Sequence, residues 1–177
     1  DFKKTYHTIT KLKRGETPED VDKYIYAKYC VGDDELNKKA IEAAHIASKK
    51  MKNMPISKRK KIVLDILKNL EQNEEEFINM LVIEGHPYKL AKWEFCSMLK
   101  GLSKTSNNLC KNDLFRELGT EGNERVYSVR KPDGVVVVSP PKNASASNSL
   151  AAVYAFLSGN SVIVKVPLKA PIATIFA

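Results

Sequence analysis

Hydrophobic residues form two short unbroken runs near the end of the chain, with a helix-like segment between them. The first run, Val135–Val138, consists of β-branched residues, which is typical of a parallel strand covered on both faces. Apolar residues then recur at helical spacing from Asn148 to Leu157, and Gly159 follows where a left-handed cap would end a helix. A second run, Val162–Val164, resumes the sheet. The pattern predicts a β-α-β unit.

The loops that follow these two strands form the predicted binding region. In open parallel sheets, ligands bind beyond the carboxyl ends of the strands. In this sequence those ends are residues 139–143 and 165–169. We therefore expect the functional residues in these two loops.

Earlier in the chain, helical spacing of apolar residues predicts four amphipathic helices, and so a helical layer. Their apolar stripes comprise Leu36, Ala40, Ala44, Ala47 and Met51; Ile62, Val63, Ile66, Leu67 and Leu70; Phe77, Leu81 and Val82; and Ala91, Phe95, Met98, Leu102 and Leu109. Ser57 is predicted to cap the second of these helices. Asn73 and Glu76 are predicted to form a capping box for the third, which Gly85 should end.

Two other segments flank this layer. Thr17, followed by a proline and an acid, signals the start of another helix, which we expect to run to Cys30. Residues 114–133 alternate in polarity around a Gly-Asn pair, which predicts an antiparallel hairpin.

The predicted organisation is therefore an α/β fold with four parts. A helical layer comes first, then a β-hairpin, then the first β-α-β of a parallel, Rossmann-like nucleotide-binding sheet that is truncated. The parts are an N-terminal extension with one helix (1–32), the helical layer (33–113), the hairpin (114–133) and the incomplete β-α-β unit (134–177).

The composition is that of a globular protein with one sizeable core. The chain has 177 residues, of which 43% are hydrophobic and 28% are charged. No apolar run is long enough to cross a membrane, and the basic N-terminus lacks the apolar core of a secretion signal, so a cytoplasmic protein is expected. The three cysteines are widely spaced and form no CxxC pair. We expect neither a disulfide framework nor a metal site.

The net charge of +8 raises the question of an anionic partner. Its densest part is the lysine-rich run at 49–61, where the lysines alternate with apolar positions and no aromatic residue is available to stack on bases. This pattern favours a solvated helix face over nucleic-acid binding. An acidic polymer stays an open alternative.

Three stretches carry a family resemblance. The helical layer contains EGHP at 84–87, the hairpin runs into RKPDGV at 130–135, and SPPKN at 139–143 is followed by GNSVIVKVP at 159–167. Together they resemble the N-terminal part of the aldehyde dehydrogenase superfamily, over roughly residues 33–177. The match is to the family's opening helices, its oligomerisation strands, its proline-tryptophan-asparagine turn and its glycine-asparagine-lysine strand.

The resemblance implies an activity and a set of site residues. The whole enzyme would oxidise a small-molecule aldehyde through a cysteine thiohemiacetal, with NAD or NADP as cofactor. Asn143 would donate its amide to the oxyanion, and Lys165 would contact the ribose or phosphate of the cofactor. The other implied cofactor contacts are Ser139, Pro140, Pro141, Lys142, Pro167, Leu168 and Lys169. The resemblance also implies a homo-oligomer formed through the hairpin 114–133.

The residues alone favour Asn143 as a turn residue after two prolines, and Lys165 could be an ordinary strand-end lysine. The sequence also departs from the family pattern. Lys142 replaces the tryptophan and Ser145 replaces a proline. Leu168 stands where an acid commonly holds the ribose hydroxyls, so a 2′-phosphate would be tolerated and NADP is at least as well supported as NAD. The glycine-rich phosphate fingerprint of ordinary Rossmann folds is absent.

The catalytic cysteine is the main gap in this interpretation. None of Cys30, Cys96 and Cys110 lies beside a histidine or in a glycine-rich loop that would activate it, and two are expected inside helices and one at a helix end. The histidines, His7, His45 and His86, are isolated and are expected at the surface or at helix caps. The chain as given therefore lacks the nucleophile and should be inactive alone.

Two other functions fit the same residues. One is a CoA-linked acyl-CoA reductase of the same superfamily, acting on an acyl thioester. The other is a non-catalytic fragment that binds a nucleotide or serves assembly.

Overall fold

The computed structural model describes residues 6–10, 25–108, 115–144, 150–168 and 170–176. The chain divides into two compact units, residues 1–40 and 41–177. The boundary falls within helix α1 (Asp34–Met51).

The first unit contains an antiparallel strand pair. β1 (Tyr6–Thr10) pairs with β2 (Ile25–Cys30), with Tyr6 opposite Cys30 and an irregularity between Ile9 and Thr10. The predicted helix ending at Cys30 is therefore wrong over residues 25–30, and its start signal at Thr17 lies outside the described residues. The pairing partner is distant in sequence, so local helix signals did not reveal it.

Helix α1 begins where the sequence predicts. The Leu36 N–H donates to Asp33 Oδ1 at 2.7 Å, which satisfies one of the free donors of the first turn. Ala44 and Met51 are buried, whereas Leu36 is 46% exposed. The predicted apolar stripe is therefore buried only towards the end of the helix.

The next three helices are α2 (Ile56–Gln72), α3 (Glu74–Ile83) and α4 (Tyr88–Asn108). We call these three the helical layer. The predicted cap at Ser57 is wrong, because Ser57 lies inside α2, whose N-cap is Pro55. Asn73 is the N-cap of α3 as predicted, but its side chain makes no capping hydrogen bond, so the predicted capping box does not form. Asn73 Nδ2 instead donates to the Asn69 carbonyl, at 2.7 Å. Gly85 ends α3 as predicted, at φ +105°.

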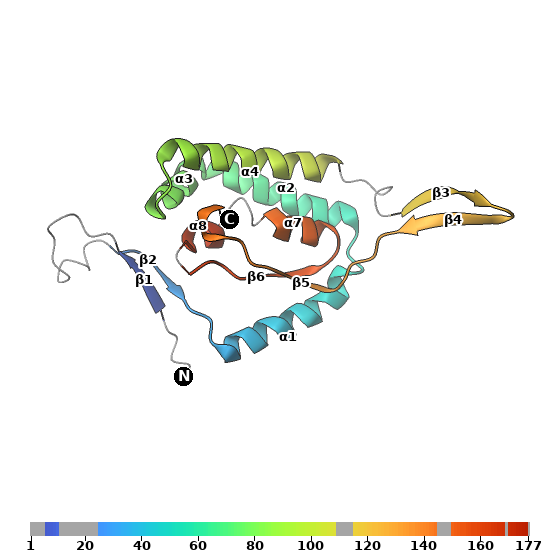
Figure 1. The fold of residues 1–177 in the computed structure, drawn as a ribbon, viewed down its shortest axis with the longest axis horizontal. Coiled ribbons are helices and arrows are strands. Elements are labelled where there is room, and N and C mark those ends of the chain that lie inside the picture. Colours follow the sequence, from blue (N-terminus) through green and yellow to red (C-terminus); the bar gives the residue numbers. More distant parts are fainter. Residues whose placement is uncertain (1–5, 11–24, 109–114, 145–149, 169, 177) are drawn as a thin grey trace. The chain divides into compact units, whose positions relative to one another are not determined.

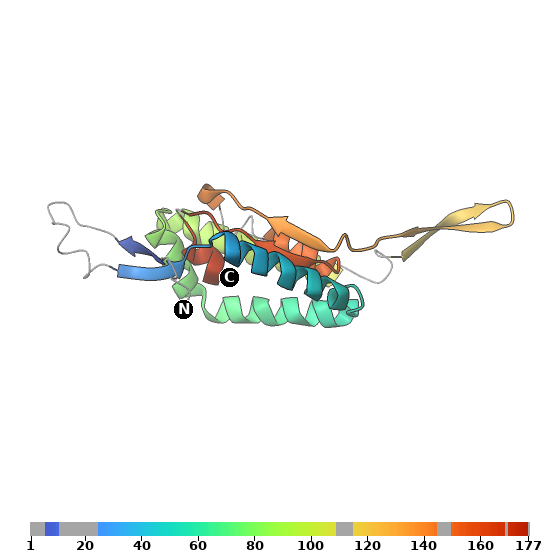
Figure 2. The same cartoon turned by 90° about the horizontal axis from the view of Figure 1, so that it is seen from below.

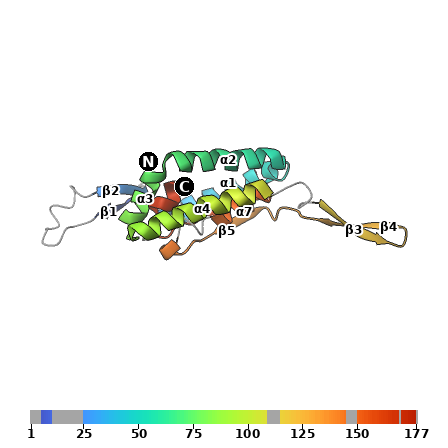
Figure 3. The ribbon, with the colours of Figure 1, turned by 90° about the horizontal axis from the view of Figure 1, so that it is seen from above.

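The core lies between these helices and the later elements of the second unit. Figure 3 shows α2 and α4 side by side, and α3 packs against α4. Phe77 and Phe95 lie at the centre of the core, with ring centroids 5.4 Å apart. The buried core residues are Val63, Leu67, Leu70, Phe77, Ile78, Leu81, Ala91, Phe95, Met98, Leu102, Leu157 and Ala173. Most are the predicted stripe residues, so helical periodicity identified the core correctly.

The β-α-β unit is confirmed. β5 (Val135–Val138) and β6 (Ser161–Val164) form a two-stranded parallel sheet. α7 (Leu150–Leu157) contacts both strands as well as α2 and α4, so it lies between the sheet and the helical layer (Figure 1). α8 (Ile172–Phe176) packs on α3. Val137 is 61% exposed, so among the described residues the sheet is not covered on both faces as predicted.

A buried asparagine joins the two ends of this unit. Asn160 is 3% exposed, its Oδ1 accepts from the Gly134 N–H at 2.9 Å, and its Nδ2 donates to the Ala155 carbonyl at 3.2 Å. One side chain thus ties the start of β5 to the end of α7. Both amide atoms are satisfied, as burial of a polar side chain requires.

The predicted hairpin is also present. β3 (Phe115–Glu121) and β4 (Glu124–Val129) pair antiparallel around Gly122, whose φ is +62° (Figure 2). The Phe115 and Tyr127 rings stack at 4.9 Å between centroids. Every residue of both strands is exposed. The apolar side chains of the hairpin are therefore exposed, and none of the described residues covers them.

Candidate active site

The two predicted binding loops leave the same edge of the β5–β6 sheet. The strands are paired in parallel from Val135 with Ser161 to Val138 with Val164, and the Lys165 N–H then donates to the Val138 carbonyl at 2.8 Å. The structure thus places residues 139–144 and 165–168 next to each other. Lys169 lies outside the described residues.

Most of the predicted site residues are open to solvent at this edge. Pro140 is buried and Pro167 is half-buried. The exposed residues are Ser139, Pro141, Lys142, Asn143, Lys165 and Leu168. The described parts of the two loops carry two exposed ammonium groups, those of Lys142 and Lys165, and no carboxylate. Such a donor set suits an anionic ligand such as a phosphate.

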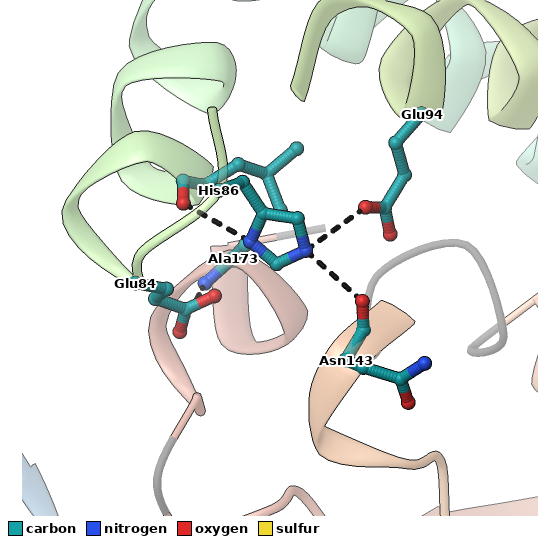
Figure 4. A network of polar contacts seen from close by, with 6 residues as sticks. Glu84, His86, Glu94, Asn143 and Ala173 are labelled. Atoms are coloured by element: carbon teal, nitrogen blue, oxygen red, sulfur yellow. Dashed lines mark hydrogen bonds and ion pairs between the residues drawn. The ribbon is translucent and has the colours of Figure 1, made fainter. Parts of the chain in front are cut away.

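Asn143 lies in a single 3₁₀ turn, Lys142–Ala144, that follows the two prolines. Its main-chain carbonyl accepts from His86 Nε2 at 3.1 Å. Figure 4 shows its carboxamide pointing away from the His86 ring. The backbone of Asn143 is therefore anchored inward, while its carboxamide is exposed and makes no hydrogen bond with the part of the chain that the structure describes, so it could donate to a ligand.

His86 is the residue that the sequence analysis misjudged. It is 8% exposed, and so it is neither a surface residue nor only a cap. Its Nδ1 lies 3.2 Å from the Leu81 carbonyl and its Nε2 lies 3.3 Å from Glu94 Oε2. A local signal did exist: His86 directly follows the helix-ending Gly85, and its backbone N–H donates to the Leu81 carbonyl. The residue at this position of such a cap commonly packs inward.

Glu84 supports the last described helix. Its Oε1 accepts from the Ile172 N–H, and also from the Ala173 N–H at 3.3 Å, at the start of α8. Burial raises the pKa of the Glu84 carboxyl above its ordinary value of 4.5, while these two hydrogen bonds and the nearby His86 oppose the rise. Its Oε2 is buried and has no hydrogen-bond partner among the described residues.

Replacing Glu84 with glutamine should change how stability depends on pH. A raised folded-state pKa means that the folded chain keeps this proton where the unfolded chain has lost it. The contribution of Glu84 to the free energy of unfolding therefore decreases as pH rises from 4.5 through the folded pKa. Glu84→Gln keeps an acceptor for Ile172 but does not titrate. Urea unfolding over a pH series should show the wild-type value falling relative to the variant as pH rises.

The control is Glu71→Gln, which removes a carboxylate from an exposed position of α2. It reports the general effect of one surface charge. If the free energy of unfolding of the wild type rose relative to that of Glu84→Gln as the pH increased, the raised pKa assigned to Glu84 would be contradicted.

Neither Cys30 nor Cys96, the two cysteines within the described residues, lies in the two loops at this edge. Cys96 is exposed on α4, and Cys30 belongs to a strand rather than to the predicted helix. Cys110 lies outside the described residues. Within the described ranges, no three His, Cys, Asp or Glu residues gather closely enough to hold a metal ion. In the same ranges, none of the helices combines the length and apolarity needed to cross a membrane.

The sequence matches known proteins over most of its length. The model of the aldehyde dehydrogenase family matches residues 10–177. Lactaldehyde dehydrogenase of Methanococcus maripaludis (strain S2) is 29% identical over 146 residues, which cover 81% of this chain and 31% of the relative. The lactaldehyde dehydrogenase of Methanocaldococcus jannaschii is 29% identical over 78% of this chain and 30% of the relative. The chain thus spans about a third of the length of these curated relatives.

Solved structures agree with this match. Glyceraldehyde-3-phosphate dehydrogenase GapN from Methanocaldococcus jannaschii, complexed with NADP, aligns with a TM-score of 0.77 and 26% identity, covering 86% of this chain and 33% of that one. A salicylaldehyde dehydrogenase from Pseudomonas putida G7 aligns with a TM-score of 0.78 over 88% of this chain and 33% of that one. Its 21% identity supports the fold alone.

Proposed function

The chain belongs to the aldehyde dehydrogenase family, and from this premise we propose that it is the N-terminal, nucleotide-binding part of an NAD(P)-dependent enzyme that oxidises an aldehyde. The proposal rests on the observation that the two predicted binding loops leave the same edge of the β5–β6 sheet. There an exposed amide donor, Asn143, and an exposed ammonium group, Lys165, stand in adjacent loops.

The proposed chemistry gives Asn143 one task. A cysteine thiolate from chain outside these residues attacks the aldehyde carbon, and the carbonyl oxygen becomes the oxyanion of a thiohemiacetal. The Asn143 amide donates a hydrogen bond to that oxyanion, where the charge develops. A bound nicotinamide would supply the acceptor for the hydride that leaves the thiohemiacetal carbon, and water would then hydrolyse the resulting thioester to the carboxylic acid and the free cysteine thiolate. Residues 1–177 alone should therefore not turn over.

The two loops fit a dinucleotide with a 2′-phosphate. Lys165 would reach the ribose or phosphate, and the exposed Lys142 adds positive charge at the same edge. Leu168, 56% exposed, stands where an acid would otherwise accept from the ribose hydroxyls. We propose NADP as a cofactor at least as good as NAD. The NADP found in the GapN complex supports this choice.

Replacing Leu168 with glutamate should shift the preference towards NADH. The new carboxylate can accept from a free 2′-hydroxyl and repels a 2′-phosphate. We expect the ratio of NADPH affinity to NADH affinity to fall by about tenfold, roughly 1.4 kcal/mol. Fluorescence titration with each nucleotide measures the ratio. Leu168→Gln is the matched control, since it has the same length without the charge, and an equal fall in that variant would sink the explanation.

The activity itself is tested on the whole protein that contains this sequence. Small aldehydes are incubated with NADP or NAD. Lactaldehyde is tested first, because the curated relatives are lactaldehyde dehydrogenases. We expect aldehyde-dependent reduction of the nucleotide and formation of the carboxylic acid. Failure of every small aldehyde, in a preparation that binds the nucleotide, would overturn the function. A product that forms only with CoA, as a thioester, would favour the acyl-CoA reductase alternative.

The hairpin supports a proposal about assembly. Its exposed apolar side chains include Phe115 (51%), Leu118 (60%) and Val129 (50%). Apolar area of this kind on a two-stranded hairpin is more stable when it is covered. We propose that the hairpin pairs with a second copy of the chain, as in the family's oligomerisation strands. A monomeric mass in solution would contradict this.

A further inference from the structure

A buried side chain from the loop between α3 and α4 contacts the turn that carries Asn143. His86 Nε2 contacts the Asn143 carbonyl at 3.1 Å, and the two residues are 57 positions apart in sequence. Pro140 and Pro141, which precede the turn, have no backbone N–H to donate. This part of the chain therefore depends more on side-chain contacts to fix its position.

The neighbours of His86 orient its ring. Figure 4 shows Nε2 facing both the Asn143 carbonyl and the Glu94 carboxylate. Nδ1 lies 3.2 Å from the Leu81 carbonyl. Each of these neighbours is an acceptor, so the contact with Asn143 is attractive only when Nε2 carries a hydrogen. Glu94, on α4, is 3% exposed, and its Oε2 lies 3.3 Å from Nε2. Glu94 and the Asn143 carbonyl both favour a hydrogen on Nε2. The Leu81 carbonyl favours a hydrogen on Nδ1, so two acceptors face Nε2 and one faces Nδ1.

We propose that His86 is a positioning residue for Asn143. By holding the carbonyl of Asn143 inward, His86 fixes the 3₁₀ turn so that the carboxamide keeps pointing away from the His86 ring (Figure 4). This inference rests on the proposed role of Asn143 as the oxyanion donor. A donor that serves a transition state must be held within a fraction of an ångström, and a misplacement of about 1 Å can lower the rate about a hundredfold.

The experiment compares variants of the whole protein that contains this sequence. His86→Phe keeps a ring in the buried site and removes both nitrogens, and His86→Gln restores one amide donor. Two quantities are measured: the steady-state kcat and KM for an aldehyde, and hydrogen exchange of the amides of Lys142, Asn143 and Ala144. The control is His45→Phe, at an exposed histidine of α1.

We expect His86→Phe to lower kcat by about tenfold to a hundredfold, with KM within about twofold of wild type. Hydrogen exchange in the turn should become faster. His86→Gln should recover part of both losses, and His45→Phe should change neither. A KM effect alone would point to a general disturbance of substrate binding and would count against the proposal.

A folded His86→Phe variant with wild-type exchange in the turn would overturn the inference, even if kcat fell. If His86→Phe does not fold, Glu94→Gln and His86→Gln decide the question by the same exchange measurement, and unchanged exchange in both would overturn it. If the wild-type protein oxidises no aldehyde, the proposed function fails. The exchange measurement then still decides whether His86 holds the turn.

Discussion

Replacing Asn143 with alanine lowers kcat for aldehyde oxidation by about a hundredfold to a thousandfold in the whole enzyme. Removing one oxyanion donor typically costs about 2.7 to 4 kcal/mol of transition-state stabilisation. Alanine keeps the main-chain carbonyl that accepts from His86, so the turn keeps its anchor. Asn143 is exposed, and its loss should leave the free energy of unfolding almost unchanged. Steady-state kinetics and urea unfolding measure the two quantities.

The matched control is Lys142→Ala, an exposed neighbour in the same turn. The Lys142→Ala variant should retain the wild-type kcat and lower only the affinity for the cofactor. A kcat for Asn143→Ala within about threefold of wild type would contradict the oxyanion role, because it corresponds to less than about 1 kcal/mol.

Replacing Gly159 with alanine should lower the free energy of unfolding more than replacing Gly85 with alanine. Gly159 has a φ of +96°, a region in which a side chain costs about 1 to 3 kcal/mol. A Cβ added there would also collide with Nη1 of Arg59 and lie 3.5 Å from the Pro132 Cβ. Arg59 is 6% exposed, so its guanidinium group has little room to move away from an added methyl group.

Gly85 separates the two contributions. It has a similar φ of +105°, but an added Cβ would meet nothing within 4 Å. Gly85→Ala therefore reports backbone strain alone. We expect urea unfolding to show a further loss of at least about 1 kcal/mol in Gly159→Ala. Equal losses of unfolding free energy in the two variants would mean that the contact with Arg59 does not destabilise Gly159→Ala.

The helical layer and the β-α-β unit could be predicted because their signals are local. Apolar spacing located helices α1 to α4, and the β-branched run Val135–Val138 located β5. Glycines with positive φ, such as Gly85 and Gly159, ended the helices where expected. Parallel pairing then dictated that the loops at 139 and 165 share an edge.

The wrong predictions concern residues whose secondary structure or burial depends on contacts with residues far away in the sequence. Residues 25–30 form a strand because residues 6–10 pair with them, so these residues are not part of the predicted helix. His86 looked isolated in sequence because its neighbours Glu94 and Asn143 are brought to it by the fold. Val137 was expected to be covered on both faces, but its exposed fraction of 61% shows that the described residues cover only part of the sheet.

The most direct test of the central claim is hydrogen exchange of the whole protein with and without NADPH. The account predicts that NADPH slows exchange at the amides of residues 139–144 and 165–168, which form the proposed site, while α2 amides stay unchanged. Binding of NADPH with no protection in either loop, or no binding at all, would contradict the assignment of this sheet edge as the cofactor site.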